Sequence, residues 1–304
     1  MIHYDPHRWL DHFFDLRGSA LREVLARVLL CVAWAAVVVG VHVHITPIAI
    51  PSTVHALTGF AIGLLLVFRT NASYDRFWEG RKLWGGIVNS SRNLIRAADA
   101  YFGDQDPDCL RELARWTAAF PFAAMNALRG VPGLGAVEAD LPSLQVAVLR
   151  RSQHPALAVA GQMTSLVAQA HANGRISAFH QTALDVFIKE LVDHLGGCER
   201  IRKTPLPFAY VVHLRRVLVL YCATLPFALV DSYRWLTVLD VLLVSYVFFG
   251  IEEIGVEIEG PFGFDANDLP LEDICETIRH NVYAFGKVSP EAAHVAPDPL
   301  PDGL

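Results

Sequence analysis

An oxygen-rich loop near the end of the chain carries side chains that could bind a metal ion. It runs Gly260-Pro-Phe-Gly-Phe-Asp-Ala-Asn-Asp268 and contributes Asp265, Asn267 and Asp268. Carboxylate and amide oxygens suit a hard cation such as calcium, which takes about 6–8 of them. The segment lacks EF-hand spacing, and Asp and Asn also favour turns for their own sake. It is a candidate cation site, with an ordinary turn as the alternative.

Histidines are the other candidate metal ligands, and the chain has 13 of them. His3 and His7 lie four apart, whereas His42, His44 and His55 gather near two apolar stretches. A spacing of two puts His42 and His44 on different faces of a helix, so we interpret these groups as solvated or interfacial. The chain contains no G-x-x-x-x-G-K-[ST], H-E-x-x-H or G-x-S-x-G motif. The sequence therefore gives no argument for an enzyme.

Two charge-free stretches of 18 residues, Val28 to Ile45 and Pro51 to Phe68, predict membrane-spanning helices. At about 1.5 Å per residue each nearly crosses a hydrocarbon core of roughly 30 Å. Only Thr46 to Ile50 separates them, with Pro47 as breaker, which predicts a helical hairpin. Pro51 suits the first turn of the second helix, where its missing N–H costs nothing.

Two later stretches are weaker candidates for spans. Val217 to Val230 is uncharged and extends toward Leu236, and Val241 to Ile251 is shorter and is followed by an acidic pair. A weak pair beside a clean pair suggests that protein partly shields the weak one. Within the second clean stretch, Gly59 and Gly63 form a G-x-x-x-G pattern, which favours close packing either within one subunit or between subunits.

Basic residues predict the orientation of these spans. A polar and aromatic block follows Phe68 directly and includes a group of basic residues: Arg69, Arg76, Arg81, Lys82 and Arg92. Further basic residues lie in the other segments that we place on the cytoplasmic side. The two proposed outer loops, Thr46–Ile50 and about Asp231–Leu236, hold a single basic residue, Arg234. By the positive-inside rule, the second span ends at Arg69 on the cytoplasmic side, and both termini face the cytoplasm.

The composition agrees with a cell-membrane protein that has a sizeable soluble part. Hydrophobic residues make up 53% and charged residues 18% of 304 residues, against about 25% charged in soluble domains. A net charge of −6 gives no reason to expect nucleic acid as a partner. The five cysteines show no metal-ligand spacing, and we expect no cleavable signal peptide at the N-terminus.

In the rest of the chain, apolar side chains at helical spacing predict further helices. They are expected at Leu83–Ala100, Leu110–Leu128, Ser143–Leu149, Ala156–Ala172 and Ile176–Leu195, with a loop at 130–135. We expect an N-terminal cytoplasmic segment at 1–27, a transmembrane hairpin at 28–68, a cytoplasmic helical region at 69–204, spans 3 and 4 at 205–256, a cytoplasmic C-terminal segment at 257–288 and a disordered tail at 289–304.

Three segments together resemble the bestrophin family, and in particular its bacterial homologues. Arg17-Gly-Ser19 precedes the first span. Arg69 to Gly86 follows the second, with Tyr74 and Asp75 spaced as in animal members, and Gly260-Pro-Phe-Gly263 follows the fourth. Their order and spacing cover nearly the whole chain.

The resemblance implies a homopentameric, all-α ion channel with four transmembrane helices per subunit and a large cytoplasmic helical bundle. One pore follows the fivefold axis. The second span lines its membrane part, the neck, and a cytosolic aperture lies in the soluble part. The implied partners are further copies of the chain, the lipid bilayer and monovalent ions. Animal members favour chloride and some bacterial members pass sodium or potassium, so both selectivities stay open.

Aligned from Arg69 without gaps, the neck positions fall at Thr53, Leu57 and Ala61, which share one helical face. The family pattern there is bulky and apolar, and only Leu57 matches it cleanly. A shift of one residue would place Val54, Thr58 and Ile62 in the neck instead. Either face is uncharged, so such a pore would gate by dewetting rather than by coordinating ions.

The segment Gly174-Arg-Ile176 resembles the family segment before the aperture, which makes His180 the constricting residue, with Ile176 and Phe179 as alternatives. A ring of five His180 side chains would gain positive charge on acidification and lower relative cation permeability.

The resemblance also bears on the loop at Asp265, Asn267 and Asp268, which corresponds to the calcium clasp of animal members. Phe264 stands in place of the first acid, and two acids of the clasp are missing. We therefore expect weak or absent calcium dependence and no required cofactor.

We thus expect a passive, pentameric ion channel. An alternative from another class is a membrane receptor or scaffold whose cytoplasmic helices bind a partner without conduction. A membrane-embedded enzyme would need convergent polar groups in a closed pocket, which the sequence does not offer.

Overall fold

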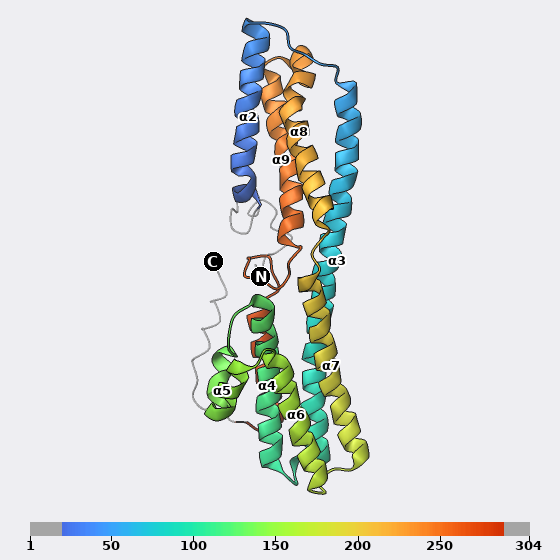
Figure 1. Ribbon diagram of the computed structural model, residues 1–304, viewed down its shortest axis with the longest axis vertical. Coiled ribbons are helices and arrows are strands. Elements are labelled where there is room, and N and C mark those ends of the chain that lie inside the picture. Colours follow the sequence, from blue (N-terminus) through green and yellow to red (C-terminus); the bar gives the residue numbers. More distant parts are fainter. Residues whose placement is uncertain (1–19, 289–304) are drawn as a thin grey trace, which may run out of the picture. The chain divides into compact units, whose positions relative to one another are not determined.

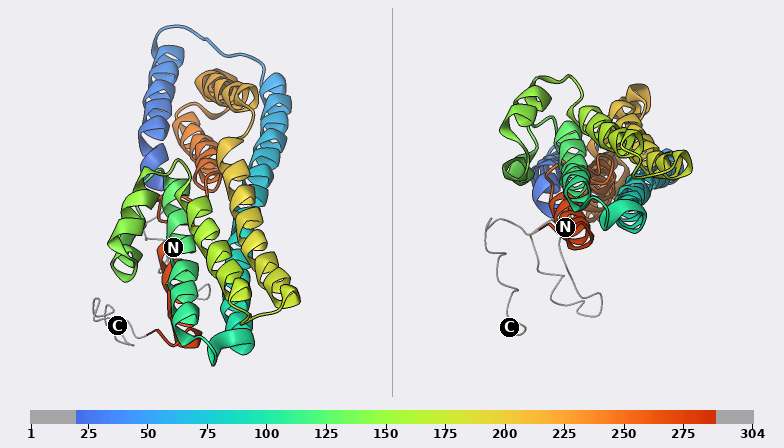
Figure 2. Two further views of the ribbon diagram at one scale, coloured as in Figure 1. Left: turned by 60° about the horizontal axis from the view of Figure 1, so that its bottom comes forward. Right: turned by 90° about the horizontal axis from the view of Figure 1, so that it is seen from below.

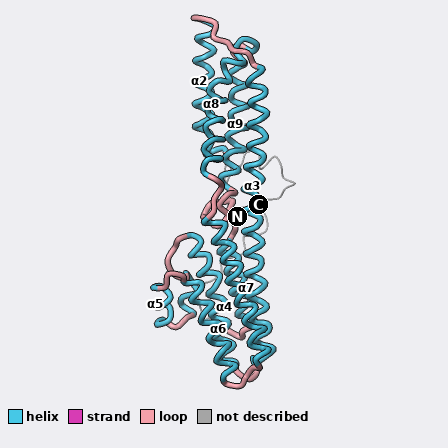
Figure 3. Tube along the Cα trace, turned by 45° about the vertical axis from the view of Figure 1, so that its right-hand side comes forward, coloured by secondary structure: helices cyan, strands magenta, loops and turns pink. Residues whose placement is uncertain are grey.

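The computed structural model describes residues 20–288, and over this range the chain is all-helical with no strand (Figures 1 and 3). The helices are α2 (Leu21–His44), α3 (Thr53–Ala98), α4 (Pro107–Arg129), α5 (Ser143–Arg151), α6 (Pro155–Ala172), α7 (Ala178–Lys203), α8 (Phe208–Tyr233), α9 (Leu236–Glu257) and α10 (Leu271–Phe285), with a π-helical turn η1 (Asp99–Gly103) and a 3₁₀ turn η2 (Gly135–Asp140). The predicted all-α class is confirmed for these residues. His3, His7, Arg17-Gly-Ser19 and the predicted tail at 289–304 lie outside them.

Three of the described helices are long and apolar enough to cross a membrane: α2, α3 and α8. The helix predicted for the fourth span is present as α9, with 22 residues, but it carries four acids: Asp240, Glu252, Glu253 and Glu257. These acids, three of which lie in its last two turns, are the reason that α9 reads as a weaker span than the others.

Two local expectations are corrected by α3. The helix does not stop at Arg69 but continues without a break from Thr53 to Ala98, so the polar block and the helix expected at Leu83 are parts of one element. Pro51 lies before the first turn rather than in it. The backbone N–H of Ala56 donates to the carbonyl of Ser52, which therefore stands at the start of the helix.

The described residues form two compact units, and residues 20–81 and 200–269 make the first. The α2–α3 and α8–α9 connections lie at the same end of this unit (Figure 1). There the N–H of Ile50 donates to the carbonyl of Phe227 at 2.9 Å, and Trp34 Nε1 donates to the carbonyl of Ala223 at 2.8 Å.

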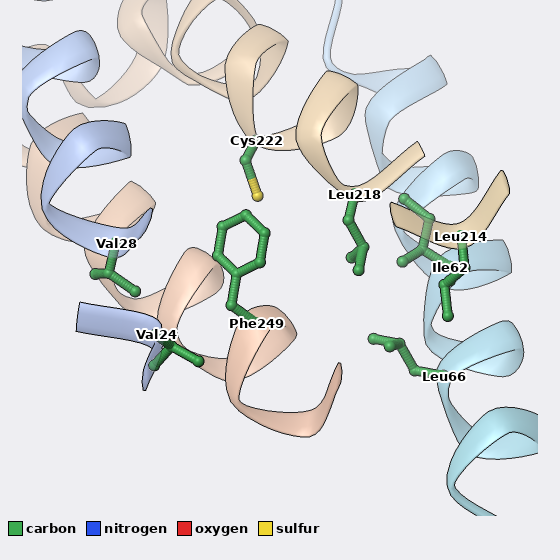
Figure 4. Close-up of a cluster of buried hydrophobic side chains, with 8 residues drawn as sticks. All are labelled: Val24, Val28, Ile62, Leu66, Leu214, Leu218, Cys222 and Phe249. Carbon is green, nitrogen blue, oxygen red and sulfur yellow. The ribbon is translucent and has the colours of Figure 1, made fainter. Parts of the chain in front are cut away.

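A cluster of buried apolar side chains from α2, α3, α8 and α9 holds this first unit together (Figure 4). Its members are Val24, Val28, Ile62, Leu66, Leu214, Leu218, Cys222 and Phe249. Phe249 from α9 points between α2 and α8, as Figure 4 shows. Because this burial joins α3 to α2, α8 and α9, it decides which side of α3 faces the rest of the first unit and which side stays open.

The second unit contains residues 82–199 and 270–288. Its central helix is α4, which packs against α6 and α10 and is buried over most of its length (Figure 2). Asp106 caps the start of α4 by accepting the N–H of Cys109 at 3.1 Å. Gly130 ends it with a left-handed φ of 71°, as is usual for a glycine after a helix.

Charge pairs join α10 to the rest of the second unit. Arg129 donates to both carboxylate oxygens of Glu272, one of them at 3.0 Å from Nη2, and this lowers the pKa of the Glu272 carboxyl. The hydroxyl of Tyr283 donates to Asp140 Oδ2 at 2.6 Å. Burial, followed by this bond and the charge of Asp140, raises the pKa of Tyr283 well above its usual range.

Two glycines permit a close approach of α3 and α7 in the second unit, and we call this contact the glycine seam. A Cβ at Gly197 would lie 2.7 Å from Leu83 Cδ2, and a Cβ at Gly86 would collide with the ring of His194. One turn further along α3, the Ser90 hydroxyl donates to Glu190 Oε2 at 2.8 Å. The two helices therefore approach each other closely, with each glycine facing a side chain of the other helix.

Candidate pore-lining face and charged cluster

The face of α3 that carries Thr53, Leu57 and Ala61 is exposed in the single chain. Leu57 is 70% exposed although it is a large apolar side chain. Residues four apart lie one above the other on a helix, so these three form one uncharged stripe. The stripe continues to Leu64 and Phe68, both exposed, which the alignment did not single out. Following the helical period two more turns would have found them.

The alternative register of the neck mixes exposed and buried side chains, since Val54 is exposed and Ile62 is not. Ile62 is only 1% exposed and belongs to the buried cluster of the first unit. Thr58 turns its hydroxyl back to the carbonyl of Val54 at 2.8 Å. A face that contains Ile62 is already used inside the subunit, which leaves the Leu57 side of α3 for other contacts.

The two glycines of the second span have different surroundings. A Cβ at Gly59 would lie 2.7 Å from Tyr221 Oη, so this glycine serves packing against α8 within one chain. A Cβ at Gly63 would meet nothing within 4 Å. Of the two, only Gly63 therefore has room for close packing by a further helix.

The structure separates the three aperture candidates. Ile176 is buried, and its carbonyl pairs with His171 Nδ1 at 2.9 Å. His180 is half-buried and stacks on Tyr101, with ring centroids 4.2 Å apart and planes 8° apart. Phe179, at the start of α7, is 87% exposed. Of the three, Phe179 has the most exposed side chain.

The side chains expected to hold a cation close their own loop instead. Asp268 accepts the N–H of Asp265 at 2.8 Å and is buried, whereas Asp265 is exposed. Asn267 donates to Glu257 Oε2 at 2.7 Å. Across residues 20–288, no group of three or more His, Cys, Asp or Glu side chains is placed to hold a metal ion. The loop also packs on α3, since a Cβ at Gly80 would lie 3.0 Å from Phe262.

A charged cluster that sequence reasoning missed lies in the first unit, centred on Glu252 of α9. Glu252 Oε1 accepts from Arg69 Nη1 at 2.6 Å and from Arg215 Nε at 2.9 Å. Arg27 Nη1 lies 3.5 Å from Glu252 Oε2 and 2.9 Å from Glu253 Oε2. Three helices thus neutralise one end of α9.

The central ion pair of this cluster is buried. The side chains of Arg69 and Glu252 are 1% and 3% exposed, and a buried charge is costly unless it is paired. The acidic pair that ends one apolar stretch and the arginine that ends another were both visible in the sequence. Their complementary charges at equivalent ends were the signal that could have paired them.

Arg76 closes the same end of the unit, two helical turns after Arg69. Its guanidinium donates to the carbonyls of Ile201 and Thr204 at the end of α7, and to the carbonyl of Glu259 at 3.0 Å. The last carbonyls of a helix have no partner within the helix, so Arg76 supplies one. The basic block after the second span is therefore partly structural and does not serve orientation alone.

These features define a helical membrane protein with an uncharged exposed face on its second apolar helix. The comparisons with known proteins agree. The chain matches the family described as Bacterial/Fungal Bestrophin protein over residues 1–284. It therefore belongs to the bestrophin family.

Individual relatives cover almost the entire chain. A voltage-dependent anion channel-forming protein of Nostoc sp. is 39% identical over 285 residues, which is 93% of each chain. The protein named voltage-dependent anion channel-forming protein YneE of Escherichia coli K12 is 33% identical over 300 residues, or 98% of each chain. The crystal structure of a bacterial bestrophin homologue from Klebsiella pneumoniae matches with a TM-score of 0.81 at 31% identity, covering 88% of this chain and all of that one.

Proposed function

We propose that this chain is one subunit of a homopentameric channel that conducts monovalent ions passively, with chloride favoured over sodium and potassium. The observation that carries the proposal is the exposed, uncharged stripe of Thr53, Leu57 and Ala61. In a single subunit such a stripe would face lipid, whereas five copies around an axis would turn it into the wall of a pore.

In this arrangement five Leu57 side chains form the bulkiest ring of the neck, and the ring gates by dewetting because it offers no ion ligands. Five Phe179 side chains form the aperture in the soluble part. The neck itself has no charge to select an ion. The preference for anions is supported by the relatives, whose names describe anion channel-forming proteins.

We further propose four crossings of the cell membrane with both termini in the cytoplasm. The arginines of the charged cluster support this orientation. Arg27 and Arg215 lie near the starts of α2 and α8, toward the opposite ends of these helices from the two connecting loops, and Arg69 meets them at Glu252. Basic residues concentrate on the cytoplasmic side of spans. No metal or cofactor is required for conduction.

The experiment is a joint measurement of mass and current. The detergent-solubilised protein is sized by light scattering, and the same preparation is reconstituted into planar bilayers with asymmetric potassium chloride. We expect a pentamer and a reversal potential close to that of chloride. A stable monomer, or a pentamer that passes no current, would favour the receptor or scaffold alternative. Reversal near the potassium potential would overturn the assigned selectivity.

A further inference from the structure

A cavity of about 290 Å³ opens between α2, α8 and α9 in the first unit. It is lined by Arg27, Arg215, Leu218, Val219, Phe249 and Glu252. The lining is divided, because two arginines lie at one part and three apolar side chains at the other. The cavity thus offers both a charged and an apolar surface to one molecule.

The arginines keep donors to spare. Arg27 uses Nη1 and Arg215 uses Nε, and within residues 20–288 no partner is found for the other two nitrogens of each guanidinium. Both side chains are about half exposed, whereas Glu252 is buried and both of its oxygens are already engaged. Glu252 therefore holds the two guanidiniums side by side. The polar groups that stay accessible in the cavity are the N–H donors of these two arginines.

The location fits a molecule at a membrane boundary. Arg27 directly precedes the charge-free stretch of α2, and Arg215 with Arg216 directly precedes that of α8. Leu218 and Val219 begin the apolar part of α8, and Val219 is exposed. A ligand seated here meets guanidiniums at the polar edge and hydrocarbon one turn further into the membrane.

We infer that this cavity binds an anionic phospholipid, with the phosphate on Arg27 and Arg215 and an acyl chain against Leu218, Val219 and Phe249. Arginine presents a fork of donors that matches phosphate oxygens, and basic pockets between spans suit anionic headgroups. A zwitterionic lipid carries the same phosphate but adds a cation that the guanidiniums repel. The inference concerns a lipid partner and does not depend on the selectivity of the pore.

The test compares lipid binding to the purified protein by native mass spectrometry. Phosphatidylglycerol and phosphatidylcholine with identical acyl chains are the probes, and inorganic phosphate is the competitor. We expect phosphatidylglycerol to bind in preference to phosphatidylcholine. Arg215→Gln should weaken it roughly tenfold, the value of one charge-assisted contact.

The matched control is Arg216→Gln, which removes the same charge from the next residue, outside the cavity. We expect it to change binding by less than about twofold. Val219→Trp fills the apolar part without touching either guanidinium and should also weaken binding, so the inference stays testable if Arg215→Gln misfolds. Equal losses at Arg215 and Arg216, equal binding of the two lipids, or full displacement by millimolar inorganic phosphate would each overturn it.

Discussion

Arg69 of α3 and Glu252 of α9 form a 2.6 Å ion pair that is almost completely shielded from solvent. The two residues are 183 positions apart, and each lies at the end of an apolar stretch. The pair therefore ties the second apolar helix to the fourth at the level where both become polar. A buried charge left without its partner is far more costly than an exposed one.

Loss of this pair should be strongly destabilising. We expect Arg69→Met to lower the free energy of unfolding by about 3–5 kcal/mol, because Glu252 would keep only the half-exposed Arg27 and Arg215. The measurement is thermal unfolding of the detergent-solubilised protein. The control is Arg200→Met, which breaks the exposed pair with Glu79 and should cost less than about 1 kcal/mol. Similar losses in both variants would mean that burial does not set the value of the pair.

Truncation in the neck should increase conduction. In the proposed pentamer, Leu57→Ala removes a bulky apolar side chain from each of five subunits, which would widen and wet the constriction. We expect a higher single-channel conductance in bilayers. Leu30→Ala is the matched control, because Leu30 is 73% exposed but lies on α2. An unchanged current for Leu57→Ala, or an equal increase for Leu30→Ala, would remove Leu57 from the pore.

The aperture assignment can be separated from the histidine alternative. Phe179→Ala should raise conductance, since Phe179 is the exposed candidate. His180→Ala should leave the pH dependence of the reversal potential unchanged, because His180 is engaged with Tyr101. Reversal potentials between pH 5.5 and 7.5, roughly the range over which a free histidine titrates, provide the measurement. A pH response that disappears only in His180→Ala would place that residue in the aperture instead.

Calcium should have little effect on the current. Asp268 and Asn267 already close the loop through Asp265 and Glu257, which leaves few free oxygens for a cation that needs about 6–8. We expect equal currents in a calcium chelator and in micromolar calcium. A steep increase over that range would show that the loop rearranges to bind the ion.

Acid should weaken the attachment of α10. Glu272 has a lowered pKa in the folded protein, so its contribution to stability is complete above the unfolded value of about 4.3 and is lost as the pH falls through the lower folded value. The carboxyl is more than half exposed, which limits the effect to less than about 1 kcal/mol. Melting temperatures below pH 4.3 should fall less steeply in Glu272→Gln than in the unmodified protein. Parallel curves would contradict the assignment.

Much of the fold could be predicted because helices leave a local signal. The helices expected at Leu110–Leu128, Ser143–Leu149, Ala156–Ala172 and Ile176–Leu195 are present as α4 to α7. The continuity of α3 was missed because its middle is polar and gives no clear apolar periodicity. Arg69 and Arg76 in this part are held by partners far away in the sequence. Such partners leave no local signal in the sequence.

The candidate site was less accessible from sequence. The ungapped alignment placed Leu57 in the neck and left the face of Ile62 as the alternative, and the packing of Ile62 against other helices now separates the two. Likewise, Ile176, Phe179 and His180 are neighbours in the chain, but their exposure depends on contacts with α6 and η1 that no local pattern predicts.

The glycine seam has a consequence for the start of α7. Gly197 is 18 residues from Phe179, which is about 27 Å along a helix. Because Gly86 and Gly197 let α3 and α7 pack closely there, the seam fixes the position of Phe179 along α7 relative to α3. A larger residue at Gly86 would displace the far end of α7 without touching any ion. In the proposed pore, conductance would therefore also depend on a position that never meets the permeating ion.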